Sequence, residues 1–337
     1  MQPVELEVVI PGYNRPSIEA TIESVLRQAM DIKAQGRVAV RACDDAGEHY
    51  NLLEQAGEKW SKYENLTISR NIKNLGMSDN LKAMIQASEA EYVLILTDDD
   101  TLEEDALTRC LDLISHQNDT AAFLFPRYGW DDDDNLRVKD CVVSRRQQKW
   151  IGGTIAHSIR YARHGFILSG LLFRRTAIDL DAWEQVKENA FFPVHVLAKI
   201  LEFERALYCD VSIVRHRVFN ETFWHRWGND DTTIAKRLYE DFANLFIALF
   251  EDARLSLSPR EKAKCRYYLW WNLVRERVSW SLIQSPEISP PRLIGGDTAV
   301  MIAFRFSEHL ISLFWRPLSA LYRLRALGNR INFAAVK

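Results

Sequence analysis

The sequence lacks the cysteine pattern of a disulfide framework or a zinc cluster. Its 337 residues include five cysteines, at 43, 110, 141, 209 and 265, with no C-x-x-C pair. Paired cysteines at short spacing are typical of secreted disulfide scaffolds and of zinc sites. Their absence indicates a reducing compartment, and no signal peptide precedes the first strand-like residues. We therefore expect a cytoplasmic protein.

Two further features are missing: a long apolar run and an excess of basic charge. The sequence has no uncharged apolar run of the roughly 18 residues that a transmembrane helix needs. Lys and Arg number 43 against 46 Asp and Glu, a net charge of -3. Without a basic field, nucleic acid is not an expected partner. The 47% hydrophobic and 26% charged content predicts a folded globular protein of one large or two modest domains.

The glycine-rich signatures of two nucleotide-binding folds are also missing. The first strand-like run, residues 6–10, ends in Pro11 and Gly12. Neither G-x-G-x-x-G nor a Walker A sequence follows it. A dinucleotide-binding fold and a P-loop are therefore not supported.

What is present is an alternation of strand-like and helix-like segments. The strand-like segments are residues 6–10, 38–43, 66–69 and 92–96, and the helix-like segments between them are 17–30, 49–62 and 77–90. This alternation predicts an α/β fold with a mostly parallel sheet flanked by helices and right-handed crossovers. Residues 121–125 and 207–214 predict later strands. From residue 232 onward the pattern is helical, with an apolar face between Ile234 and Phe250 and a further helix at 267–283.

Carboxylates follow two of the predicted strands. Asp44 and Asp45 follow the second, and Asp98, Asp99 and Asp100 follow the fourth. Carboxyl ends of parallel strands meet at one edge of a sheet, so these groups should converge on one crevice. Adjacent carboxylates repel one another unless a cation or hydrogen-bond donors compensate, and magnesium is usually held by carboxylates together with substrate phosphates. The pattern favours a metal and phosphate site; a solvated acidic turn is the alternative.

Four motifs in this order resemble those of the family 2 glycosyltransferases. They are I-P-G-Y-N-R at 10–15, D-D at 44–45, N-L-G at 74–76 with Asn80, and the strand that leads into D-D-D at 98–100. The segments S-G-L-L-F-R-R at 169–175 and F-P-V-H at 192–195 are most similar to the O-antigen, abequosyltransferase-type branch. The resemblance implies the GT-A fold, with a catalytic domain at 1–230 and a helical region at 231–337. Within that domain, 1–105 would bind the nucleotide-sugar and 106–230 the acceptor.

The resemblance also implies which residues bind the donor. They are Pro11, Tyr13, Asn14, Arg15, Asp44, Asp45, Asn74, Asn80, Asp98 and Asp99. Asp44 or Asp45 would accept a hydrogen bond from the imide N–H of uracil or thymine, although turn chemistry also explains this pair. Asn74 and Asn80 would touch the ribose or position the loop, and Asn74 is equally suited to be a plain turn residue.

A divalent cation, Mn²⁺ or Mg²⁺, is the implied cofactor. Asp100 would coordinate it, with Asp98 as a further ligand. His216 is another candidate, because some GT-A enzymes place a late histidine on the metal, or it has a capping or core role. The cation would neutralise the diphosphate and stabilise the charge of the leaving group.

The acceptor side departs from the family pattern. Where the family commonly has an acidic pair beyond the FRR-like segment, this sequence has Val194 and His195. His195 would act as the base that removes the acceptor proton, or is a structural residue. Asp181, Glu184 and Glu188 are alternative bases, and a retaining mechanism becomes plausible if none serves. The residues implied on the acceptor side are Ser169, Gly170 and Arg226.

The sequence therefore predicts a glycosyltransferase that moves a sugar from a nucleotide diphosphate donor to a glycan or lipid-linked acceptor. The alternatives are a nucleotidyltransferase and an inactive nucleotide-sugar-binding or scaffold protein. Residues 300–337 carry six basic residues against one acidic, with aromatic side chains at helical spacing. This tail would contact a membrane surface, or it is a packing helix with a solvated basic edge.

Overall fold

The computed structural model describes residues 4–30, 36–130, 136–140, 148–217, 231–253, 256–284, 300, 302–304 and 307. The chain separates into two compact units, residues 1–220 and 221–337, each described here by itself. The predicted boundary at 230/231 falls at the end of residues 218–230, which lie outside the described part. Among the described helices, none combines the length and the apolar character needed to cross a membrane.

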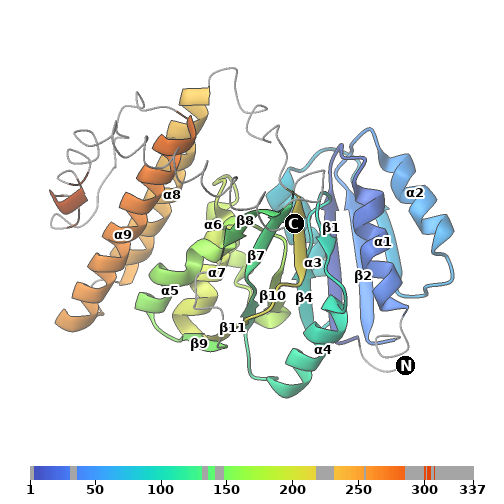
Figure 1. The fold of residues 1–337 in the computed structure, drawn as a ribbon, viewed down its shortest axis with the longest axis horizontal. Helices are drawn as coiled ribbons and strands as arrows, with labels where there is room; N and C mark the ends of the chain where they lie inside the picture. The colour runs from blue at the N-terminus through green and yellow to red at the C-terminus, as the bar shows by residue number, and fades with distance from the viewer. Residues whose placement is uncertain are drawn as a thin grey trace, which may run out of the picture. The chain divides into compact units, whose positions relative to one another are not determined.

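An eight-stranded sheet forms the centre of the first unit, with the strand order β3-β2-β1-β4-β10-β6-β11-β9 (Figure 1). The strands are β1 (Leu6–Gly12), β2 (Val38–Asp44), β3 (Leu66–Arg70), β4 (Tyr92–Ile95), β6 (Ala122–Leu124), β9 (Lys149–Gly152), β10 (Leu171–Arg174) and β11 (Arg205–Tyr208). The first four are mutually parallel. β10 runs antiparallel to both β4 and β6, so β6 has the direction of β4. The predicted mostly parallel α/β sheet is confirmed.

Helices cover both faces of this sheet. They are α1 (Ile18–Ala29), α2 (Tyr50–Lys59), α3 (Met77–Ala87), α4 (Ala106–His116), α5 (Ile155–Tyr161), α6 (Leu180–Val186) and α7 (Phe192–Phe203), with the 3₁₀ helices η1 (Ala162–Phe166) and η2 (Arg175–Ala177). Side chains alternate along each strand, so β1 sends Val8 and Ile10 into a core with α1 and α4. Val9 points the other way, into a core with α3 and α7. Continuous apolar strands are what a sheet buried on both faces requires.

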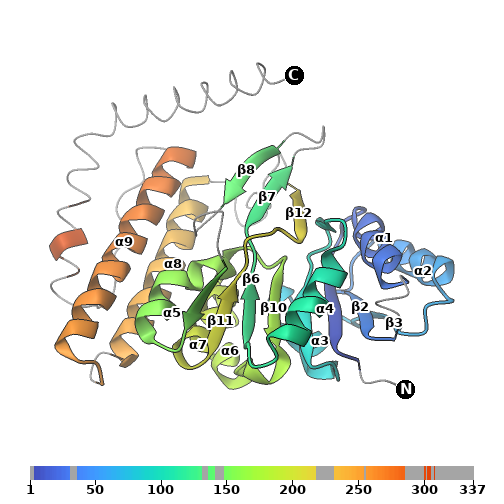
Figure 2. The same cartoon turned by 60° about the horizontal axis from the view of Figure 1, so that its bottom comes forward.

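A second, four-stranded sheet was not predicted. It contains β5 (Thr101–Leu102), β12 (Val214–Arg217), β7 (Arg127–Trp130) and β8 (Leu136–Asp140), in that order. Figure 2 shows β7, β8 and β12 together, beyond the end of β6. The strand predicted at 207–214 is in fact two strands, because the chain bends between β11 and β12 and changes sheets. This sheet begins directly after Asp100.

The second unit contains two long helices packed on each other, α8 (Asp231–Ala253) and α9 (Pro259–Gln284). The apolar face predicted for α8 is buried, as Phe242, Phe246 and Phe250 show. α9 begins eight residues before the predicted start at residue 267. Ser258 and Glu261 explain this, because each side chain accepts a hydrogen bond from the backbone N–H of the other, at 3.4 and 3.0 Å. Such a capping box fixes the first turn of a helix.

The contact between η1 and α7 gives a stability prediction. A Cβ on Gly165 would lie 2.5 Å from the carbonyl oxygen of Pro193 and 2.8 Å from the Cα of Val194, so the two backbones must separate. We expect Gly165→Ala to lower the free energy of unfolding by about 1–3 kcal/mol. Gly57→Ala in α2 is the control, because its Cβ meets only the tip of the Ile68 side chain and alanine favours a helix. Urea unfolding measures both, and equal destabilisation would contradict the close approach.

Candidate functional site

Asp98 joins the loop after β1 to the loop after β4. Its carboxylate accepts a hydrogen bond from the backbone N–H of Tyr13 at 2.8 Å. Its backbone carbonyl accepts one from the Ser17 hydroxyl at 2.9 Å. Because β1 and β4 are parallel neighbours, both loops leave the same edge of the sheet, which we call the carboxyl edge. The predicted convergence of these two motifs is therefore present in the structure.

Arginine and buried carboxylates share this edge. The Arg15 guanidinium contacts the Asp99 carboxylate, and its Nε lies 3.6 Å from an Asp98 oxygen. Burial, with the neighbouring charge of Asp99, raises the pKa of Asp98 to about 7. Burial, with the charge of Asp100, also raises the pKa of Asp99. The negative charges are thus held at an electrostatic cost, and an added cation would be favourable here.

Asp100 is fully buried and is bound by the second sheet. Its two carboxylate oxygens lie 2.9 and 3.0 Å from Nδ1 of His216, and one of them accepts the backbone N–H of Arg217 at 2.8 Å. Burial lowers the pKa of His216, but the hydrogen bond and charge of Asp100 outweigh it and leave that pKa raised. β12 therefore supplies two of the groups that compensate the Asp100 charge.

Ser169 and Gly170, which were predicted for the acceptor side, lie beside the loop that carries the aspartates at 98–100. Antiparallel pairing of β10 with β4 places them next to Thr97, and the Gly170 N–H donates to the Ile95 carbonyl at 2.9 Å. Gly170 has a φ of +83°, a conformation that favours glycine. The Ser169 hydroxyl accepts the backbone N–H of Thr97 at 2.9 Å. Thr97 was not among the predicted site residues, although its position directly before the aspartates could have indicated it.

Asp45 is used inside the protein. Its carboxylate accepts three hydrogen bonds of 2.8 Å, from the Asn71 side chain and from the backbone N–H groups of Leu75 and Gly76. Asp44 accepts the backbone N–H of Gly47 at 2.8 Å and lies 3.3 Å from Nε of Arg70. Asp45 therefore anchors the loop at 71–76, whereas Asp44 shapes the turn after β2.

The asparagines of the predicted site also fix loops. Asn14 adopts a left-handed conformation, and its side-chain oxygen accepts the backbone N–H of Glu48. Asn74 accepts the backbone N–H of Gly76 at 2.9 Å, the turn chemistry that was its alternative. Asn80 is buried, where its side-chain oxygen accepts a 3.0 Å hydrogen bond from Asn71. These side chains hold the loops at the carboxyl edge in place.

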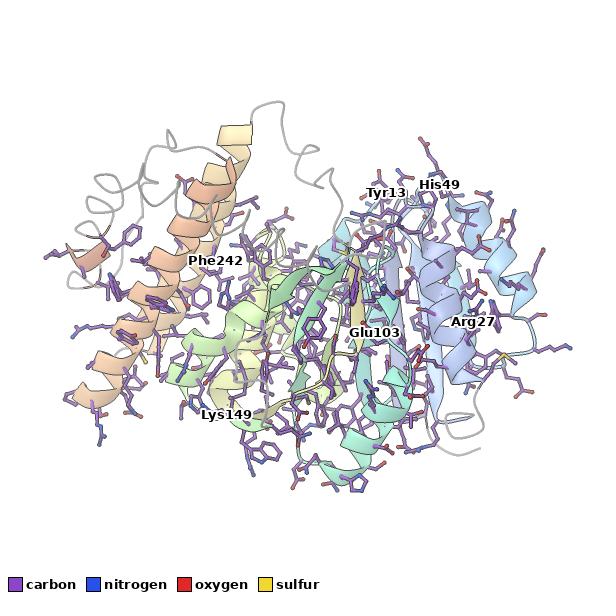
Figure 3. All side chains as sticks on the ribbon, viewed as in Figure 1. Tyr13, Arg27, His49, Glu103, Lys149 and Phe242 are labelled. Atoms are coloured by element: carbon purple, nitrogen blue, oxygen red, sulfur yellow. The ribbon has the colours of Figure 1, made fainter. Side chains whose placement is uncertain are left out.

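An exposed aromatic side chain lies at the carboxyl edge, directly after β1. The Tyr13 side chain, directly after β1, is 37% exposed, and the preceding Pro11 is buried within the strand. Figure 3 shows Tyr13 and His49, which follow β1 and β2, at the same end of the sheet. The loops after these two strands therefore rise together at the carboxyl edge.

The base candidates differ in position, and Glu184 of α6 forms ion pairs with Lys82 and Lys187. His195 is buried in the first turn of α7. α7 leads into β11, which is parallel to β6, so the helix begins towards the carboxyl edge. Asp181 is exposed in the first turn of α6, and Glu188 is exposed two residues beyond that helix. The role of each candidate as the catalytic base stays a prediction. Arg226 lies outside the described residues.

The donor set at the carboxyl edge fits a divalent cation in part. Asp100 and His216 offer a carboxylate and an imidazole in contact with each other. No cluster of three or more His, Cys, Asp or Glu side chains arranged for a metal occurs among the residues that the structure describes. Hard cations complete their shell with phosphate oxygens and water. The arrangement suits an ion that arrives with a diphosphate.

Comparisons with known proteins agree with this architecture. Crystal structures of S. aureus TarS 1–349 resemble the chain at 15% identity and a TM-score of 0.53, covering 93% of this chain and 92% of that one. The same protein in complex with UDP-GlcNAc matches at 14% identity, a TM-score of 0.51 and the same coverage. The mannosyltransferase PcManGT from Pyrobaculum calidifontis, in complex with GDP-Man and Mn²⁺, matches at 15% and 0.53, covering 98% and 88%. At such identities the likeness shows the GT-A fold alone.

The sequence comparisons decide the family. A search of curated proteins gives no match. Residues 7–180 match the family model described as Glycosyl transferase family 2. The matched stretch runs from β1 to the start of α6 and includes the aspartates at 98–100. Since it spans more than half of the chain, the protein belongs to glycosyltransferase family 2.

Proposed function

We propose that this protein transfers a sugar from a nucleoside diphosphate donor to a hydroxyl of a glycan or lipid-linked saccharide, with the help of Mn²⁺ or Mg²⁺. One observation carries the proposal: Asp100, the last of the three aspartates that follow β4, contacts His216 of the second sheet. The chain's family membership supports it. Two similar structures, one in complex with UDP-GlcNAc and the other with GDP-Man and Mn²⁺, support the choice of donor and cofactor.

Charge balance supports a metal in this proposal. A diphosphate brought beside three aspartates adds negative charge to a site where burial already raises the pKa of Asp98 and Asp99. Arg15 supplies one compensating cation. Asp100 and His216 would hold a divalent ion, which as a Lewis acid supplies stabilisation of the departing diphosphate. Asp98 would be a further ligand through the oxygen that does not accept the Tyr13 N–H.

The nucleotide base would be recognised by Asp44 in preference to Asp45. Asp45 already accepts three hydrogen bonds from the loop it anchors, so a new donor would have to displace one of them. Asp44 lies in the turn between β2 and Gly47, at the carboxyl edge. The exposed ring of Tyr13 offers a surface for the base, and Asn14 fixes the turn beside it. A carboxylate is a suited acceptor for an imide N–H.

On the acceptor side, His195 is our proposed base. It lies in the first turn of α7, which packs on η1, the segment that leads towards Ser169 and Gly170. Asp181 and Glu188 are exposed on and after α6 and are the weaker candidates. An imidazole takes up a proton near neutral pH, as deprotonation of an acceptor hydroxyl requires.

The two alternatives make different predictions. A nucleotidyltransferase would consume a nucleoside triphosphate, and family 2 membership argues against it. An inactive scaffold would bind the donor without releasing a nucleoside diphosphate. Measuring diphosphate release from a bound donor, with and without saccharide acceptors, separates the scaffold from the enzyme.

Nucleotide binding tests the donor site itself. We expect one nucleoside diphosphate from a panel of UDP, dTDP and GDP to bind in a Mn²⁺-dependent manner in titration calorimetry. Asp100→Asn should weaken that binding at least ~10-fold, because it removes the charge that holds the metal while preserving the shape of the side chain. Asp119→Asn is the matched control, since Asp119 is exposed just before β6, at the opposite edge of the sheet. Absence of binding by every nucleotide would contradict the proposal.

A further inference from the structure

Helix α9 exposes two large aromatic side chains on its surface. Tyr267 is 57% exposed and Trp271 is 47% exposed, and they lie one helical turn apart. The buried row of the same helix contains Cys265, Leu269 and Leu273, which are fully covered. The exposed aromatic residues therefore lie outside the core that α9 forms with α8. Large exposed aromatic groups at adjacent turns commonly mark an interaction surface.

The same half of α9 is basic. Arg260 and Lys264 are exposed and continue the row of Tyr267 and Trp271 at helical spacing. Between residues 259 and 274 the helix has four basic residues against one acidic, whereas the whole chain has a net charge of -3. The acidic residue, Glu261, is bound by the capping serine. This face, defined by Arg260, Lys264, Tyr267 and Trp271, is called the α9 face below.

We propose that the α9 face docks on the surface of an anionic phospholipid membrane. Tyrosine and tryptophan place an apolar ring and a polar tip at the headgroup level, and lysine and arginine are attracted to anionic headgroups. Both chemistries occur here on one row of one helix. The inference deepens the proposed function, because a lipid-linked acceptor would be presented at such a surface. It does not use residues 308–337, which lie outside the described part of the chain.

Vesicle flotation of the full chain, without donor or acceptor, tests this inference. We expect binding to phosphatidylcholine vesicles that contain phosphatidylglycerol and little binding to phosphatidylcholine alone. The pair Tyr267→Ser with Trp271→Ser, and the pair Arg260→Glu with Lys264→Glu, should each weaken partition about tenfold or more. Trp150→Ser and Lys62→Glu are controls that change an exposed aromatic and an exposed lysine of the first unit.

Three outcomes would overturn the inference. They are no flotation of the wild type, equal flotation of the α9 variants, and a concentration-dependent dimer in light scattering that these variants abolish, since a second copy would then cover the face. Calorimetry of nucleotide binding separates the two claims. An α9 variant that no longer floats with vesicles but still binds nucleotide supports docking. A wild type that binds no nucleotide bears on the proposed function only.

A separate observation concerns Thr97 and Ser169, at the junction of β4 and β10. The Thr97 hydroxyl lies 2.8 Å from an Asp99 oxygen, 3.1 Å from an Asp100 oxygen and 2.7 Å from the Ser169 hydroxyl. Ser169 is buried, and its oxygen also accepts the Thr97 backbone N–H. Thr97 has one hydroxyl proton. The Ser169 hydroxyl therefore donates its hydrogen bond to the Thr97 oxygen. The single Thr97 hydroxyl proton is donated to the Asp99 or the Asp100 carboxylate, one at a time.

We infer that Thr97 and Ser169 are positioning residues for the donor diphosphate and its metal. The hydroxyl chain fixes the directions of the Asp99 and Asp100 carboxylates, which repel each other, and ties them to the strand on the acceptor side. Groups that orient metal-binding carboxylates strongly affect metal affinity. This inference rests on the proposed function.

The Mn²⁺ dependence of nucleotide binding tests the role of the hydroxyl. Thr97→Val keeps the shape and removes the hydroxyl, and should raise the Mn²⁺ concentration needed for nucleotide binding about tenfold. Thr97→Ser should restore it, and Ser169→Ala should have an intermediate effect. Thr67→Val, on the exposed face of β3, is the control. A wild type that binds while Thr97→Val shows only a lower unfolding midpoint would overturn the inference, whereas a wild type that binds no nucleotide overturns the proposed function.

Discussion

The buried carboxylate of Asp100 is the group on which the rest of the site depends. A charge removed from water is costly unless hydrogen bonds and an opposite charge compensate it. Here the compensation comes from His216 and the backbone of Arg217, far along the chain. The short second sheet lies next to this contact, because β12 pairs with β5, and β5 begins directly after Asp100. Strand β12 therefore both forms the second sheet and compensates the charge of Asp100.

The other carboxylates are compensated from the opposite side. Arg15 and the backbone N–H of Tyr13, both in the loop after β1, bind Asp99 and Asp98. Each member of the triplet thus has its own partner, and the three lie between two halves of the fold. The raised pKa of Asp98 shows that this compensation is incomplete. A diphosphate with its cation would enter a site already prepared to accept positive charge.

Local patterns predicted the strands of the first hundred residues well. Mostly apolar runs precede Pro11, Asp44 and Asp98, and helix-like segments separate these runs along the chain. The parallel strands and their common carboxyl edge follow from this pattern. The second sheet could not be predicted in this way, because β5 has two residues and its partner lies over a hundred residues away. Two strands of one predicted segment, 207–214, join different sheets, and no local pattern specifies that change.

Some roles of single residues could be predicted from local patterns, and others depend on contacts that form only in the folded chain. Asp45 was grouped with Asp44 because both follow β2, but only the folded loop at 71–76 brings three donors to Asp45. Ser258 and Glu261 form a capping box that the sequence did contain, and using it would have placed the start of α9 correctly. Thr97 contacts groups on two strands at once, which depends on the antiparallel register of β10 with β4.

The most direct test of the account is a crystal structure with a nucleoside diphosphate and Mn²⁺, with diffraction data recorded at the manganese absorption edge. The account predicts one anomalous peak within coordination distance of an Asp100 oxygen, bridged to the diphosphate, with the His216 imidazole beside it. A diphosphate bound at the carboxyl edge with manganese absent from Asp100, or manganese and nucleotide bound elsewhere on the chain, would contradict it.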